Sequence, residues 1–161
     1  MADAVFAASD GIVTTFAIVA GSAGASLNTN VVLILGFANL FADGFSMAAG
    51  NYLGAKSEIE FEKAKGSRTD GEGSPLVHGG ITFAAFNIAG LIPLTPFLFL
   101  VSSPFVSSAF LVGAALFLVG VMRSYYTKRS IFKSGTEMLL VGGFAALAAF
   151  LTGEVLKKAV G

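Results

Sequence analysis

Residues 38–47 read ANLFADGFSM and place one carboxylate, Asp43, among mostly apolar side chains. A second aspartate, Asp10, opens a similar run, DGIV, at residues 10–13. A carboxylate at the centre of a bilayer costs about 2.5–3.5 kcal/mol on insertion scales, so it is seldom found there without something to bind. We therefore look for function at these two aspartates.

The composition is that of a membrane protein. Hydrophobic residues make up 55% of the 161 residues and charged residues 12%, and the mean hydropathy is +0.80. An ordinary soluble domain has about 25% charged residues. The net charge is zero and no basic tract is interleaved with aromatic residues, so nothing indicates nucleic acid as a partner. Cysteine is absent, which excludes disulfides and thiolate metal sites, and we expect no signal peptide at the N-terminus.

Five hydrophobic runs predict an all-α membrane protein, a single transmembrane domain that crosses the bilayer five times. The expected spans are residues 4–27, 31–53, 79–101, 105–122 and 138–156. Proline at positions 93 and 96 predicts a kink in the third span. Glycine and alanine pairs four residues apart, such as Gly50 with Gly54 and Ala17 with Gly21, allow close helix packing or dimerisation.

The loops alternate in charge and so predict the topology. Eight cations lie in a short charged loop at residues 56–75 and in a second loop at residues 123–133, whereas the other two connections are short and uncharged. The positive-inside rule makes the charged loops cytoplasmic, with the N-terminus inside and the C-terminus outside. Lys157 and Lys158 oppose this arrangement but are outnumbered.

Polar residues recur every fourth position on the second span and form a stripe, made of Asn39, Asp43, Met47 and Asn51. On the first span, two turns separate Asp3 from Asp10, so they also share a face. If the two faces meet, three carboxylates and a thioether converge. Carboxylates alone suit Mg²⁺ or Ca²⁺, whereas a thioether favours a late first-row ion such as Fe²⁺.

Each of these residues has a structural alternative. Met47 is also compatible with ordinary packing, Asp10 with the cap of a broken helix, and Asp43 with a neutral, hydrogen-bonded acid. Metal binding requires deprotonated carboxylates, whereas an apolar site favours protonated ones. Metal entry should therefore expel protons, which is the physical basis of an exchanger.

Further candidates lie outside the apolar spans. Glu58 and Glu62 share a helical face near the inner end of the second span, where they either gather cations or form a solvated helix end. His78, the only histidine, is interpreted as an interfacial residue. Residues 68–74 have the composition of a flexible linker. No catalytic motif is present, so we expect no enzyme and no prosthetic group.

Two long motifs, DGIVTTFAIVAG at residues 10–21 and NLFADGFSMAAGNYL at residues 39–53, resemble the first two helices of the vacuolar iron transporter family. GLIPL at residues 90–94 and EMLLVGG at residues 137–143 are similar to its third and fifth helices. The resemblance implies a five-helix homodimer that exchanges Fe²⁺, and often Mn²⁺, for protons along its interface. It also implies that Asp10 and Met47 are intramembrane ligands and that Asp3 lies at the cytoplasmic mouth.

The chain departs from the family pattern in two ways. Asn39 and Asn51 stand where many relatives carry glutamate, which makes the path less acidic. The long cytoplasmic metal-binding domain is reduced to about twenty residues, similar to plant nodulin-like members.

These observations together predict a divalent transition-metal exporter. The membrane is the plasma membrane in a prokaryote, or a vacuolar or other organelle membrane in a eukaryote. The main alternative is a non-transporting membrane metal sensor or assembly scaffold, and a passive channel is a third possibility. Carboxylate and thioether ligands do not rank Fe²⁺ against Mn²⁺, Co²⁺, Ni²⁺ or Zn²⁺.

Overall fold

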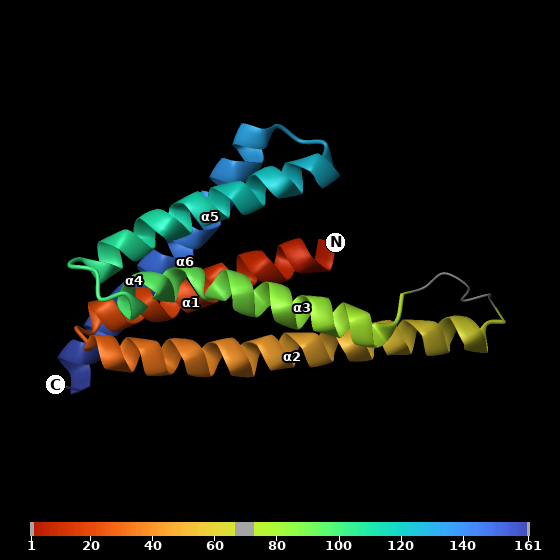
Figure 1. Cartoon of the computed structure of the whole chain (residues 1–161), viewed down its shortest axis with the longest axis horizontal. Helices are drawn as coiled ribbons and strands as arrows, with labels where there is room; N and C mark the ends of the chain where they lie inside the picture. Colours follow the sequence, from red (N-terminus) through yellow and green to blue (C-terminus); the bar gives the residue numbers. More distant parts are fainter. Residues whose placement is uncertain (1, 67–72, 161) are drawn as a thin grey trace.

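The computed structural model describes residues 2–66 and 73–160, and its regular structure in these ranges is entirely helical (Figure 1). The elements are α1 (Ala2–Gly24), α2 (Thr29–Ala64), α3 (Pro75–Gly90), η1 (Ile92–Leu94), α4 (Thr95–Leu98), α5 (Pro104–Thr127) and α6 (Ile131–Val160). Five segments are long and apolar enough to cross a membrane, with η1 and α4 completing the span that α3 begins. The predicted all-α fold with five spans is confirmed.

Three helices extend beyond their predicted spans. α2 continues to Ala64 and is 36 residues long, so residues 56–64, which we expected to be loop, are helical. The reason is composition: this segment is rich in Glu, Lys and Ala, all strong helix formers, and Lys56 pairs with Glu60 one turn later at 3.9 Å. α6 likewise begins at Ile131 rather than at 138, and α5 runs to Thr127, so the charged connection between them is only residues 128–130. Most of the predicted 68–74 linker lies outside the described residues.

The third span is broken, as its prolines predict. α3 ends at Gly90, a 3₁₀ turn carries Pro93, and the short α4 carries Pro96 near its start. A proline removes a backbone hydrogen bond and so leaves carbonyls of the preceding turn unpaired. The carbonyl of Pro93 accepts a hydrogen bond of 2.7 Å from the buried hydroxyl of Ser108 on α5. The break therefore ties the third span to α5.

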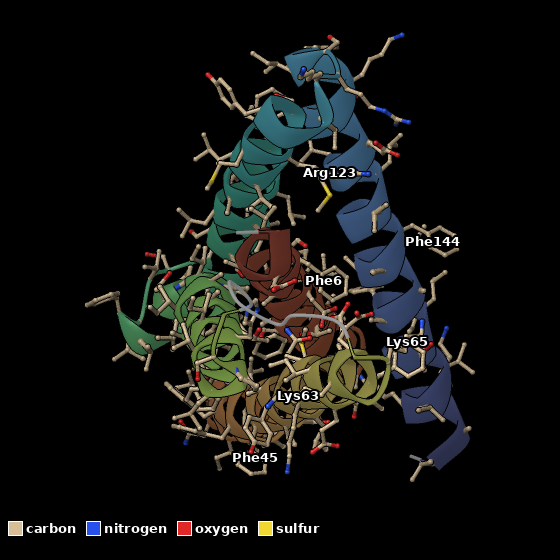
Figure 2. All side chains as sticks on the ribbon, turned by 90° about the vertical axis from the view of Figure 1, so that its right-hand side faces the viewer. Phe6, Phe45, Lys63, Lys65, Arg123 and Phe144 are labelled. Atoms are coloured by element: carbon tan, nitrogen blue, oxygen red, sulfur yellow. The ribbon has the colours of Figure 1, made fainter. Side chains whose placement is uncertain are left out.

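α1 is the centre of the bundle and packs against α2, α3, α5 and α6 (Figure 1). Its buried residues Ala7, Ile12, Phe16 and Val19 join a core that also includes Leu40, Phe86, Leu94, Val112 and Leu116. The outer faces carry large exposed apolar side chains, including Phe45 on α2 and Phe144 on α6, both of which point away from the bundle in Figure 2. Such an exterior fits acyl chains as its solvent. The chain is thus an integral, multi-pass membrane protein.

Glycine permits the closest helix contacts. Gly21 of α1 lies against the backbone of Ala149 on α6, so the pair Ala17 and Gly21 belongs to a helix crossing. The pair Gly50 and Gly54, in contrast, has no neighbour within 4 Å among the described residues. Gly79 of α3 meets α2 so closely that an added Cβ would lie 2.8 Å from the carbonyl oxygen of Ala48.

Gly79→Ala should lower the free energy of unfolding by about 1–3 kcal/mol, because a methyl group at the crossing of α2 and α3 forces two backbones apart. Gly80→Ala is the matched control: the site is the next residue of the same helix, and an added Cβ there meets nothing within 4 Å. The measurement is unfolding of both purified variants in detergent. Equal stabilities for the two variants would contradict the close crossing.

Candidate metal site

Asp10 on α1 and Asp43 on α2 lie on different helices but interact electrostatically. Both side chains are partly buried, and the charge of Asp43 is felt at Asp10. α1 is unbroken from Ala2 to Gly24, so Asp10 is not the cap of a broken helix, and that alternative is wrong. The hydroxyl of Thr14 donates to the backbone carbonyl of Asp10 rather than to its carboxylate, at 2.8 Å. The carboxylate thus remains available to a ligand.

The predicted stripe on α2 lies along one partly buried face. Asn39, Asp43, Met47 and Asn51 are all partly buried, beside the fully buried Leu40 and Gly44. Met47 packs against the hydrophobic core, as its packing alternative predicts. The side-chain nitrogen of Asn39 is buried and finds no hydrogen-bond partner in the described part of the chain. The amide of Asn51 donates to the hydroxyl of Thr82 on α3 at 2.6 Å. The stripe therefore lies on the face of α2 that packs against the rest of the bundle, and its polar side chains face the same way.

Asp10 also lines a cavity of about 490 Å³ between α1, α5 and α6. The walls are largely apolar, and the other charged residue lining it is Arg123 of α5. Arg123 donates to the carboxylate of Glu137 on α6 at 3.2 Å. Figure 2 shows Arg123 on the side facing α6, at the same end of the bundle as the start of α1. From the sequence, Arg123 is predicted only as part of a charged loop, because a contact between residues so far apart along the chain leaves no local pattern.

A second cavity, of about 440 Å³, opens where the start of α1, the second half of α2 and the start of α3 meet. It gathers three residues predicted from sequence, Asp3, Asn51 and Glu58. It also contains His78, whose Nδ1 lies 3.2 Å from an oxygen of Asp3. Glu62 lies one turn beyond Glu58 on α2 and does not line this cavity. His78 is therefore part of the polar cluster rather than an isolated interfacial residue.

The carboxylates do not form a complete metal cage within one chain. Among residues 2–66 and 73–160, no group of three or more His, Asp or Glu side chains is positioned to hold a metal ion. Asp10 and Asp43 supply two carboxylates, and the nearby donors on the stripe are amides and a thioether. Any ion bound between them therefore needs further ligands.

The sequence profile of the VIT family matches residues 1–73 and 66–154, which together cover nearly the whole chain. The chain belongs to the VIT family. A vacuolar iron transporter of Toxoplasma gondii is 29% identical over 224 aligned positions, covering 98% of this chain and 74% of the relative. Vacuolar iron transporter homolog 1 of Arabidopsis thaliana is 30% identical over 155 positions, covering 90% of this chain and 76% of the relative. VIT proteins are transporters, so the chain is a transport protein and not an enzyme.

The effects of Asp10→Asn and Asp43→Asn on the stability of this VIT protein should not be additive. Either substitution alone removes the electrostatic repulsion between Asp10 and Asp43, so the second substitution has no repulsion left to remove. The interaction free energy of the double-mutant cycle should therefore be about 0.5–3 kcal/mol. The measurement is unfolding of both single variants and the double variant, without metal and at a pH where the carboxylates are charged. Glu60→Gln, roughly five turns further along α2, should be additive with Asp10→Asn. Additive effects of Asp10 and Asp43 would show that their charges do not interact.

Proposed function

We propose that the chain exports a divalent transition metal, Fe²⁺ in the first instance and also Mn²⁺, from the cytoplasm in exchange for protons. The observation that carries the proposal is the convergence of Asp10 and Asp43 from two helices inside an apolar bundle. Two partly buried carboxylates in an apolar bundle are costly unless a cation or protons neutralise them. Membership of the VIT family and relatives named as iron transporters support a metal as that cation.

The donor set favours a late first-row ion. Asp10 and Asp43 supply hard oxygen ligands, whereas the Met47 thioether is a soft donor that adds little for Mg²⁺ or Ca²⁺. Asn39 and Asn51 extend the stripe with amide oxygens, as neutral ligands or as hydrogen-bond partners of metal-bound water. The proposed path thus runs along α2, beside Asp10 of α1.

A second copy of the chain is the proposed source of the missing ligands. Among the described residues of one protomer, no three His, Asp or Glu side chains are placed to hold a metal ion, and Asp10 lines a cavity between α1, α5 and α6. In a two-fold dimer, each ligand recurs in the partner, so two carboxylates become four. This supports a homodimer with the metal path at its interface.

Proton exchange follows from the chemistry of the empty site. Carboxylates close together in an apolar setting bind protons, and metal binding displaces those protons. A pH gradient across the membrane can therefore drive metal against its own gradient, which a passive channel cannot do.

The distribution of charge supports a cytoplasmic N-terminus. The N-terminus, the end of α2 and the connection between α5 and α6 lie at the same end of the bundle (Figure 1). Lys157 and Lys158, the cations that oppose this orientation, are engaged locally, with Ser26 and Glu154 respectively, each at 2.7 Å. The positive-inside rule then places the charged end of the bundle in the cytoplasm.

The chain is proposed to be a short form of the family. The two matched segments of the family profile meet at residues 66–73. The alignment with the Toxoplasma gondii relative spans 224 positions, more than the 161 residues of this chain, whereas that with the plant homolog spans 155. We infer that the longer relatives carry their additional cytoplasmic residues at this junction.

Asp10→Asn should lower Fe²⁺ flux about tenfold or more, because it removes an anionic ligand while preserving shape. The measurement is Fe²⁺ uptake into proteoliposomes with an acidic lumen, recorded together with the rise in lumenal pH. Met47→Leu should also reduce Fe²⁺ flux, since leucine fills the space without a sulfur. Glu60→Gln, which changes an exposed carboxylate on α2, is the control and should leave flux unchanged.

Two outcomes would overturn the proposal. Full flux in Asp10→Asn would favour a sensor or scaffold in which the aspartate is structural. Metal flux that ignores an imposed pH gradient would remove proton coupling and leave a channel.

A further inference from the structure

His78 is oriented as a metal-ligating histidine is. Its Nδ1 lies 3.2 Å from Asp3, and an ionised carboxylate only accepts hydrogen bonds, so Nδ1 carries the proton and donates. In the neutral imidazole, the lone pair then lies on Nε2, on the other side of the ring. Histidines that bind metals are usually held in this way, by a carboxylate on the nitrogen that does not bind. Both side chains are close to half exposed, so an ion can reach them from solvent.

Gly73 lies close to the Nε2 side of the His78 ring and adds no side chain there. A Cβ added at Gly73 would lie 2.8 Å from Nε2 of His78. A metal bound to an imidazole nitrogen lies at about 2.0–2.1 Å, so a side chain at position 73 would crowd the place where such an ion binds. A residue larger than glycine at position 73 would therefore hinder metal binding to Nε2.

Glu58 supplies an anionic oxygen in the same cavity. It lines the 440 Å³ cavity with Asp3, Gly73 and His78, and it extends from α2 with an exposed, flexible side chain. The described residues hold no ready group of three acidic or histidine ligands, so an ion here would have two protein ligands and complete its shell with water. A site of that kind binds weakly and releases its ion readily, as a loading site requires.

The cavity lies at the end of the polar stripe. Asn51 lines it and is held by Thr82, whose hydroxyl also donates to the backbone carbonyl of His78 at 2.9 Å. From Asn51 the stripe continues through Met47 to Asp43, one helical turn at a time. Asn51 is therefore the polar group of the stripe that lies in the same cavity as His78.

We propose that Nε2 of His78 and the carboxylate of Glu58 form a loading site for late first-row divalent ions, with Asp3 orienting the imidazole. This inference rests on the proposed metal transport, and it assigns the loading step to the transmembrane bundle itself. An imidazole ligand favours Fe²⁺, Co²⁺, Ni²⁺ and Zn²⁺ over Mg²⁺ and Ca²⁺, so the site also selects the ion before it enters the membrane.

The test uses Co²⁺ as the probe, because its visible absorption reports its ligands. Co²⁺ is titrated into the full-length protein carrying Asp10→Asn, so that the intramembrane site is disabled and the loading site is observed alone. His78→Asn keeps a donor for Asp3 but removes Nε2, and should weaken Co²⁺ binding about tenfold. Gly73→Ala removes no ligand and should weaken binding similarly, whereas Gly80→Ala should not.

Transport kinetics separate loading from translocation. In otherwise unchanged protein, His78→Asn and Glu58→Gln should raise the KM for Co²⁺ about tenfold and leave the maximal rate unchanged, while Glu60→Gln changes neither. Asp3→Ala should raise KM, and Asp3→Asn should restore it, because asparagine still offers an oxygen to Nδ1. If the contact between Asp3 and His78 were purely structural, the absorption of bound Co²⁺ would be the same with and without Nε2. A change in this absorption in His78→Asn therefore excludes a purely structural role.

The failure of this inference is distinguishable from the failure of the proposed function. Unchanged Co²⁺ spectra and KM in His78→Asn and Gly73→Ala would overturn the loading site while Asp10-dependent flux stands. A fall in maximal rate without a change in KM would overturn it too, since His78 would then act in translocation or folding. Full flux in Asp10→Asn with Nε2-dependent Co²⁺ binding would instead refute the transport path and leave the metal site.

Discussion

Asp10 and Asp43 place two carboxylates of like charge on neighbouring helices of an apolar bundle, and their electrostatic interaction is the constraint on which the site depends. Asp10 and Asp43 repel each other, and the surrounding side chains offer little solvation in return. A bound cation, or protons, would remove the repulsion between the two carboxylates and the cost of their poor solvation. This makes the pair unstable in its empty, charged form and responsive to whatever cation reaches it, which is the property that an exchanger needs.

The pair exists only because α1 occupies the centre of the bundle. α1 contacts every other long helix, and small residues let its neighbours approach to backbone distance, as at Gly21 against Ala149. In lipid, such close packing replaces the hydrophobic effect as the force that holds helices together. The broken third span adds a polar tie, since the carbonyl of Pro93 is satisfied by Ser108. The packing thereby holds two mutually repelling groups within reach of each other.

The polar stripe of α2 links two regions with different roles. Met47 packs against the hydrophobic core, whereas Asn51 lines the cavity that Glu58 and His78 share. α2 extends without interruption past both regions, so the same helix that contributes a carboxylate to the bundle also carries Glu58 beyond it. The bundle thus carries acidic and imidazole groups at its own end.

The sequence by itself determined the class of fold, the number of spans, the break at Pro93 and the candidate residues Asp10, Asp43 and Met47. These follow from local patterns: apolar runs, proline positions and a four-residue repeat on one helix. It did not determine where α2 ends, because the charged segment after Leu53 resembles a loop in hydropathy although its residues favour helix. Only the tertiary structure paired Asp3 with His78, 75 positions apart, and placed Gly73 against the free nitrogen of the imidazole. Such contacts depend on how whole helices cross, and no spacing along the chain encodes that directly.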